Sequence, residues 1–452
     1  MTDLTNILGV GTLLTDAPLL SDDSSKAWVT VGELRTMVEA WRDQLAGPRM
    51  LVFHYIPNTV EGVAQLLGAS SAGHVIALLD PKLPAQAKAD LVDRYRPGII
   101  FDESAVRLQG APCDLHPDLA VLLSTSGSTG SPKFVRLSAS NLDANASAIV
   151  KVLDINATEV ACGHLPLHYS YGLSVLTSHL KAGAPVHLTE KGFLDPSFWP
   201  QMKRWEIAHL PGVPFHYTTL RRFGFTKLDL PELRVMTQAG GALDMRTRKI
   251  AHDYIDARGG RFHIMYGQTE AAPRITTLAH EDFIAHSETV GPALPNGGIE
   301  IVGANGAPGT EGEVIFHGPN VMMGYAENPT DLALGDEMGG RLATGDIGWL
   351  DEDGRLTITG RAKRMGKIAG LRVNLDEVER ALNSFGEEFA VVQKGEVLLF
   401  YHLPNEDMDA LKQRALKQLS DRFTLPKTAY KFKEVDEFLR TSREKINYQA
   451  LN

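Results

Sequence analysis

The N-terminal third of the chain alternates strand-like apolar segments with segments of helical spacing. Residues 51–56 (LVFHYI) and 74–80 (HVIALLD) are strand-like, and residues 59–73 between them have helical spacing. The same alternation predicts further helices at 29–48 and 84–95, and further strands at 98–100 and 120–124. Repeated strand–helix–strand order is typical of stacked sheets with helices on their faces. The predicted fold class is therefore α/β.

The last of these strands runs into a segment rich in glycine and hydroxyl groups, which reads LLSTSGSTGSPKFVRL at 122–137. Gly127 and Gly130 can adopt conformations that let successive backbone N–H groups converge on an anion. Hydroxyl groups come from Ser124, Thr125, Ser126, Ser128 and Thr129, and Lys133 adds a positive charge. The spacing Gly-x-x-Gly-x-x-Lys and the β-prone FVRLS after it do not match a P-loop NTPase. Composition alone would also suit a surface linker, but the context favours a phosphate loop between two strands.

Further segments follow in a characteristic order: NL at 141–142, PLHYSYGL at 166–173, GGAL at 240–243, MYGQTE at 265–270, TGDIGWLDEDGRL at 344–356, GRAKRMGKIAGLRV at 360–373 and RTSREK at 440–445. Together with TSGSTGSPK at 125–133 they resemble the superfamily of adenylate-forming enzymes. That superfamily includes acyl-CoA synthetases, the adenylation domains of peptide synthetases and beetle luciferases. The resemblance covers almost the whole chain.

The resemblance implies a large N-terminal domain of stacked β-sheets flanked by helices and a small mobile α+β C-terminal domain. A boundary near Gly360 to Lys363 divides the chain into residues 1–360 and 361–452, with the hinge at Lys363. Turn-rich breaks at 302–312 and 351–354 predict hairpins. The smaller unit is expected to contain a helix at 375–383, strands near 389–402, and an amphipathic helix through Leu411, Ala415, Leu419 and Phe423.

The nucleotide-binding residues are assigned by the resemblance. The phosphates would be held by Thr125, Ser126, Gly127, Ser128, Thr129, Gly130 and Lys133. Glu270 would hold Mg²⁺ and Thr269 would face the α-phosphate, at the end of the motif that contains Tyr266 and Gly267. Adenine would lie between Tyr266 and the backbone of Gly240, Gly241 and Ala242.

Asp346 would accept hydrogen bonds from the ribose hydroxyls, and Arg361 would reach the ribose or the phosphates. Outside such motifs, a lone glutamate is usually a solvated surface group. Asp346 could likewise be only a turn residue, and Arg361 a salt-bridged surface group.

Lys445 is the expected catalytic lysine, brought to the reacting carboxylate and α-phosphate by the mobile domain. The family commonly has glycine before this lysine, whereas this chain has Glu444. Glu444 restricts the backbone and adds a negative charge beside Lys445, so adenylation could be slow or gated. A second, milder departure is Phe134, where the family usually has glycine after Lys133.

The acyl pocket is predicted from the resemblance to be lined by His168, Tyr169, Tyr171, Val213, Gly241 and Met265, with the stretch Val213-Pro214-Phe215 as one wall. Peptide-synthetase domains that take α-amino acids usually have an aspartate near His168, and none stands at 168–172. The segment therefore resembles the acyl- and aryl-acid branch. His168 is also a catalytic candidate beside the thiol tunnel, where Gly370 would let the pantetheine arm pass, although a core histidine would look the same.

Charge and cysteine content limit the partners and the compartment. The net charge of −10 argues against nucleic acid as the main partner. The two cysteines, Cys113 and Cys162, have no disulfide or metal-ligand pattern, which fits a reducing compartment. Neither a secretory signal nor a membrane-spanning segment is recognisable, so the expected location is cytoplasmic.

The resulting hypothesis is an ATP- and Mg²⁺-dependent ligase that converts a small carboxylic acid into an acyl-adenylate and then into a thioester. The acceptor would be coenzyme A or, alternatively, the phosphopantetheine of an acyl carrier protein. A degenerate member that binds nucleotide or an acyl ligand without ligation is an alternative of another class, favoured only by Glu444. A luciferase-like oxidative second step is a remote third option.

Overall fold

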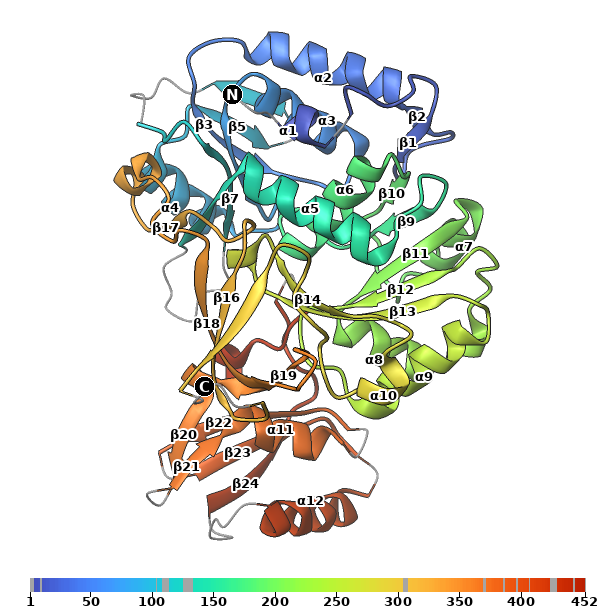
Figure 1. Cartoon of the computed structure of the whole chain (residues 1–452), viewed down its shortest axis with the longest axis vertical. Coiled ribbons are helices and arrows are strands. Elements are labelled where there is room, and N and C mark those ends of the chain that lie inside the picture. The colour runs from blue at the N-terminus through green and yellow to red at the C-terminus, as the bar shows by residue number, and fades with distance from the viewer. Residues whose placement is uncertain are drawn as a thin grey trace.

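The computed structural model describes residues 4–8, 10–102, 104–107, 114–124, 133–303, 308–368, 371–384, 387–395, 397–405, 407–422, 429–441 and 444–451. A large N-terminal part with two stacked sheets occupies the upper two thirds of Figure 1, and a small C-terminal part lies below it. This is the predicted α/β class with a large and a small unit. The boundary at residue 360 and the hinge at Lys363 stay predictions.

The first sheet contains the strands that the N-terminal alternation predicts. In spatial order its strands are β17 (Gly324–Ala326), β8 (Phe134–Ser138), β7 (Leu119–Ser124), β4 (Val75–Leu79), β3 (Leu51–Tyr55), β5 (Ile99–Asp102) and β6 (Ser104–Arg107). Strands β7, β4, β3 and β5 are parallel, whereas β8 runs antiparallel to β7. The expectation that the glycine-rich loop joins two strands is therefore confirmed, while Thr125–Pro132 itself lies outside the described residues.

The second sheet combines later segments of the chain with two short N-terminal strands. Its spatial order is β14 (Arg274–Leu278), β13 (Arg261–Gly267), β12 (Val235–Gln238), β11 (Ile207–Gly212), β9 (Val160–Gly163), β10 (Val186–Leu188), β1 (Pro18–Ser21) and β2 (Val29–Thr30). The strands from β13 to β1 are parallel neighbours. Ligands of such sheets bind beyond the carboxyl ends of the strands, which here are followed by the Gly240 turn and the Tyr266 motif.

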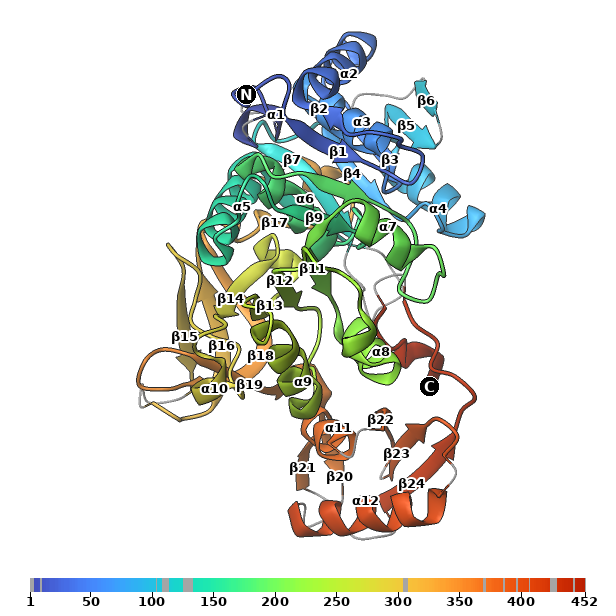
Figure 2. The ribbon, with the colours of Figure 1, turned by 90° about the vertical axis from the view of Figure 1, so that its right-hand side faces the viewer.

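Helices fill the space between the two sheets and cover their outer faces (Figures 1 and 2). The inner layer contains α1 (Leu4–Ile7), α2 (Val31–Leu45), α3 (Val60–Ser71), α5 (Ala139–Leu153) and α6 (Ser170–Ala182). The outer helices are α4 (Ala85–Tyr95) on the first sheet, and α7 (Phe198–Arg204), α8 (Pro214–Phe223), α9 (Met245–Asp256) and α10 (Phe283–His286) on the second. Helix α6 is buried from Ser170 to Leu180, so its polar side chains face protein rather than water.

Helix starts agree with the local sequence. Ser138 caps α5 and exchanges hydrogen bonds with Asn141, which forms a capping box, and Thr30 and Glu33 do the same for α2. Helix α5 begins at Ala139, just before the NL motif at 141–142, where the resembling family begins a helix.

A third sheet connects the large and small parts. Its strands are β15 (Gly298–Val302), β16 (Gly312–His317), β18 (Arg341–Leu350) and β19 (Leu356–Arg361). Antiparallel pairing of β15 with β16 and of β18 with β19 confirms both predicted hairpins.

The small part begins with η4 (Ala362–Arg364) and has its own buried core around Val378, Phe400 and Leu411. Its strands are β20 (Met365–Ile368), β21 (Leu371–Asn374), β22 (Phe389–Lys394), β23 (Val397–His402) and β24 (Tyr430–Glu434), and its helices are α11 (Leu375–Asn383) and α12 (Met408–Arg422). Leu411, Ala415 and Leu419 point into this core as predicted, while Phe423 lies outside the described residues. None of the helices in the described ranges is long and apolar enough to cross a membrane.

Candidate active site

The residues predicted to contact the ribose meet at the paired strands β18 and β19 of the third sheet. Asp346 on β18 is the register partner of Arg361 on β19, and its Oδ1 accepts a hydrogen bond from Arg361 Nε at 3.1 Å. Tyr266 comes directly after the buried residues of β13, and its hydroxyl donates a hydrogen bond to Asp346 Oδ2 at 2.5 Å. Burial raises the pKa of Asp346, although Arg361 and Tyr266 oppose the rise, and burial also raises the pKa of Tyr266. Three predicted residues from distant segments therefore form one hydrogen-bonded group.

The glycine turn after β12 lies against predicted acyl-pocket residues. Gly240 has φ +84°, and a Cβ built there would lie 2.6 Å from the Tyr169 hydroxyl and 3.1 Å from Val213 Cγ1. Only glycine fits this position without a clash. Gly241 and Ala242 are exposed, and the Gly241 carbonyl accepts a hydrogen bond from Gln238 at 2.8 Å.

Lys133 and Glu270 are brought together by Tyr325 on β17, a residue that the sequence analysis missed. The Tyr325 hydroxyl donates to Glu270 Oε1 at 2.8 Å, and Lys133 Nζ lies 3.5 Å from the centre of the Tyr325 ring. The ring thus holds the cation by a cation–π contact and the carboxylate by a hydrogen bond. Nearby, the Thr269 and Ser170 hydroxyls are 3.1 Å apart. The residues Thr125 to Gly130, predicted to complete this site, lie outside the described residues.

Glu270 does not belong to a ready-made metal cage. Among the residues that the structure describes, no group of three or more histidine, cysteine, aspartate or glutamate side chains could hold a metal ion. A single carboxylate fits an ion such as Mg²⁺, which takes most of its ligands from phosphate oxygens and water.

The segment that carries Lys445 packs against the large part beside α8. The Arg440 guanidinium lies 4.7 Å from the centre of the Phe215 ring and forms a two-pronged ion pair with Glu388 at 2.7 and 2.8 Å. Glu444 has φ +58°, a conformation in which glycine would be unstrained. Burial raises the pKa of Glu444, while the positive charges of Arg440 and Lys82 oppose the rise.

The predicted hinge lies in η4. The side chain of Lys363 and the whole of Gly370 fall outside the described part. The next residue, Arg364, pairs with Asp376 at 2.5 Å and with Glu379 at 3.0 Å, and Glu379 accepts a hydrogen bond from Tyr448 at 2.5 Å. The chain after the hinge is thereby tied to α11 and to the residues just beyond Lys445.

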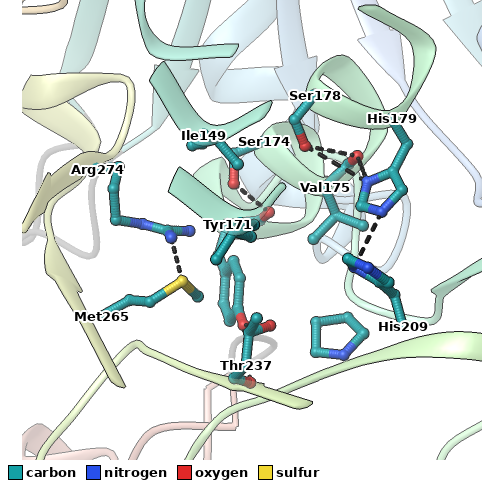
Figure 3. A pocket seen from close by; sticks show the side chains of 12 residues that line it. Ile149, Tyr171, Ser174, Val175, Ser178, His179, His209, Thr237, Met265 and Arg274 are labelled. Carbon is teal, nitrogen blue, oxygen red and sulfur yellow. Dashed lines mark hydrogen bonds between the residues drawn. The ribbon is translucent and has the colours of Figure 1, made fainter. Parts of the chain in front are cut away.

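A small cavity lies between α5, α6 and the second sheet, where the acyl pocket is predicted (Figure 3). Its free volume of about 10 Å³ is enough for one water molecule. Tyr171 and Met265, two residues of the predicted acyl pocket, line it. The other lining residues, none of which was predicted, are Ile149, Leu153, Ser174, Val175, Ser178, His179, His209, Pro211, Thr237 and Arg274.

Histidines at this cavity form a buried hydrogen-bonded series. His179 Nε2 lies 3.2 Å from His209 Nδ1, and His209 Nε2 lies 3.2 Å from Glu159. Burial lowers the pKa of His179 to about 3 and also lowers the pKa of His209. His179 is therefore neutral at physiological pH.

His168 is buried outside this cavity lining. Its Nε2 lies 3.6 Å from Asp80 Oδ2, at the carboxyl end of β4. Asp80 is far from residues 168–172 in the sequence, where the aspartate of the family pattern would stand, so this spatial neighbour was not predicted. Tyr169, one residue on, lies against Gly240, and its ring centre is 6.2 Å from that of Tyr171.

Comparison with known proteins identifies the family. A family model described as "AMP-binding enzyme" matches residues 102–326. Indoleacetate–CoA ligase of Aromatoleum aromaticum is 30% identical over 390 residues, which are 82% of this chain and 75% of the relative. The chain belongs to the AMP-binding enzyme family.

Other relatives of this AMP-binding chain agree with the assignment. Oxalate–CoA ligase of Arabidopsis thaliana is 33% identical over 279 residues, which are 59% of this chain but only 53% of the relative, so the match spans about half of that protein. The o-succinylbenzoate CoA synthetase of Bacillus subtilis, solved with an acyl-adenylate, has a TM-score of 0.80 at 21% identity and covers 100% of this chain and 98% of its own. That likeness shows the fold.

Proposed function

We propose that this AMP-binding protein is an ATP-dependent acid–thiol ligase. In the first step an oxygen of the substrate carboxylate attacks the α-phosphorus of ATP, the bond to the β-phosphate oxygen breaks, and pyrophosphate leaves. In the second step a thiolate attacks the acyl carbon, a thioester forms, and AMP leaves. The observation that carries the proposal is the convergence of Lys133, Tyr325 and Glu270 in one group and of Asp346, Tyr266 and Arg361 in another.

The two groups suit opposite ends of ATP. Asp346 offers a buried carboxylate as a hydrogen-bond acceptor for ribose hydroxyls, in exchange for the bond from Tyr266. Lys133 supplies positive charge for the phosphates, and the backbone of the preceding loop would add N–H groups. Mg²⁺ would be held by Glu270 and would neutralise charge on the phosphates.

Lys445 would stabilise the negative charge that develops around the α-phosphorus. Its segment already contacts α8 through Arg440 and Phe215, which supports the idea that it reaches the acyl side of the site. Rotation about Lys363 would then withdraw it and admit the thiol. Coenzyme A is the proposed acceptor, because the relatives named above act as CoA ligases, and a carrier-protein phosphopantetheine is the alternative.

Pyrophosphate release from ATP and Mg²⁺, measured with a panel of aliphatic, aryl, dicarboxylic and amino acids, tests the proposal. Lys445→Ala should lower release by at least ~100-fold with ATP binding retained, because it removes transition-state stabilisation only. Lys431→Ala, a lysine on β24, serves as the control and should change little. Release that is equal in both variants would contradict the role of Lys445, and transfer of preformed acyl-adenylate to each thiol would identify the acceptor.

A binding protein without ligase activity is the second candidate, because Glu444 combines positive φ with a carboxylate beside Lys445. ATP binding without pyrophosphate release for any acid in the panel would favour it.

A further inference from the structure

Among the side chains that the structure describes in the large part, three arginines are buried, and they differ in what holds their charge. Arg136 is 0% exposed and donates to four backbone carbonyls and to Glu337. Arg248 is 7% exposed and donates to the carbonyls of Leu243, Ser287 and Thr289. Both guanidinium groups have the partners that a buried charge requires.

Arg274 lacks such partners. It is 3% exposed, and the hydrogen bond recorded for its side chain goes from Nη1 to the sulfur of Met265. Its guanidinium lies 5.6 Å from the centre of the Tyr171 ring. Among the residues that the structure describes, no carboxylate forms an ion pair with it. A thioether is only a weak acceptor, so the site is electrostatically incomplete.

The group nevertheless stays charged and faces a cavity. Burial lowers the pKa of Arg274 to about 10, which is still well above neutral pH. Figure 3 shows the guanidinium directed into the cavity, beside the Tyr171 ring. The titratable groups that interact with it are Tyr171, Tyr169 and His263. They do not balance its charge, since burial raises the pKa of Tyr171 to about 12 and lowers the pKa of His263 to about 3.

The cavity is also next to the proposed adenylation site. Arg274 is the register partner of Gly267, two residues before Thr269. Tyr171 of the cavity lining directly follows Ser170, whose hydroxyl lies 3.1 Å from that of Thr269. A short acid with its reacting carboxyl near Thr269 would therefore extend toward Arg274. The flexible Met265 side chain covers the guanidinium and could rotate away.

We propose that Arg274 binds a second carboxylate of the substrate, so that the enzyme activates short dicarboxylic acids. This inference rests on the proposed ligase function. The distal carboxylate takes the place of the Met265 sulfur and forms a charge-assisted pair with the guanidinium. The cavity alone holds one water molecule, so the carboxylate occupies the space that the Met265 side chain leaves when it rotates. This limited space favours dicarboxylic acids of about three to five carbons over long or bulky ones.

The test compares acids of equal length, succinate with butanoate and glutarate with pentanoate, in the pyrophosphate assay. We expect kcat/KM of the wild type to favour each dicarboxylic acid by at least ~100-fold, because a monocarboxylic acid leaves the buried charge unpaired. Arg274→Met should abolish this preference, and Arg274→Lys should keep part of it. Arg248→Met is the matched control: it removes a fully bonded buried arginine, so it should lower Tm without changing the ratio.

The outcomes separate this inference from the ligase proposal. A wild type that prefers the monocarboxylic acids, with the same ratio in Arg274→Met, would overturn the inference and leave the ligase intact. If no acid releases pyrophosphate, the ligase proposal fails, and calorimetric titration with succinate and glutarate decides the inference. Binding that is lost in Arg274→Met would support it, whereas no binding to the wild type would overturn it.

Discussion

The nucleotide side and the acyl side of the candidate site are built differently. On the nucleotide side, Asp346, Tyr266 and Arg361 are charged or polar groups that already contact one another, and so are Glu270 and Tyr325. On the acyl side, the residues are mostly core positions of α5 and α6, and the charged Arg274 meets a sulfur atom. In the proposed reaction the nucleotide is always ATP, whereas no motif fixes the acid, so short motifs predicted one side and packing determines the other.

Asp346→Asn should have the largest effect and should be confined to the nucleotide side. The variant keeps the shape but loses the negative charge that would accept two ribose hydrogen bonds, each worth about 1.5–3 kcal/mol when charged. We expect ATP affinity to fall by ~100-fold or more, measured by titration calorimetry, with the preference among acids unchanged.

Asp351→Asn is the control for this substitution, because Asp351 lies in the turn of the same hairpin and pairs with Arg355 at 3.2 Å. It should leave ATP affinity within about twofold. Equal losses in both variants would mean that Asp346 acts only through the hairpin.

Tyr325→Phe should weaken the binding of Mg²⁺ at the phosphate end of the site by about tenfold. The variant keeps the ring that contacts Lys133 but removes the hydroxyl that holds Glu270, so Glu270 loses its orienting partner. The Mg²⁺ concentration needed for half-maximal pyrophosphate release should rise by about that factor.

Tyr95→Phe provides the comparison, since the Tyr95 hydroxyl donates to the carbonyl of Ala326, the neighbour of Tyr325, at 3.0 Å. It should lower Tm without changing the Mg²⁺ dependence. A shifted Mg²⁺ dependence in both variants would assign the effect to β17 as a whole.

His179→Gln tests whether a buried histidine on the acyl side makes the free energy of unfolding depend on pH. The pKa of His179 is about 3 in the folded protein and about 6.5 when unfolded. Between these values only the unfolded chain binds the proton, so the free energy of unfolding falls as pH drops below 6.5. One such proton gives a slope of about 1.4 kcal/mol per pH unit, and the variant should lose about that much slope between pH 6 and 5.

Denaturant titrations at several pH values give the slope for the wild type and for His179→Gln. The same slope in His179→Gln and the wild type would mean that His179 is protonated in the folded state.

The sequence predicted most of the fold because its signals are local. The strands at β3, β4 and β7, the helices α3 and α11, and both hairpins lie within a few residues of their expected positions. The short strand β6 was missed, since four residues with little alternation carry almost no periodic signal.

The candidate site was predictable only where it follows motifs. Tyr325 lies in a three-residue strand that pairs with β8, and nothing in GYA indicates that its hydroxyl reaches Glu270. Arg274 and His179 occupy core positions, where the sequence cannot tell a bonded charge from an unpaired one. The signal that was available is an arginine at the start of an otherwise uncharged strand, RITTL, separated from the MYGQTE motif by three residues.

Glu444→Gly should have the smallest effect. It tests whether the small domain changes the adenylation rate equally for every acid. A non-glycine residue at φ +58° costs about 1 kcal/mol, partly offset by the extra freedom of glycine in the unfolded chain. We expect Tm to rise slightly. The adenylation rate should rise about fivefold, because the variant also removes a negative charge beside Lys445 where triphosphate must approach.

Glu206→Gly separates the two causes, because Glu206 has φ +53° before β11 and is not part of the proposed site. It should raise Tm in the same way without changing the rate. If both variants raise Tm and neither raises the adenylation rate, Glu444 strains the backbone but does not slow adenylation through Lys445. If only Glu444→Gly gains rate, and does so for every acid in equal proportion, the small domain acts on the step that all acids share, while Arg274 alone would decide which acid is chosen.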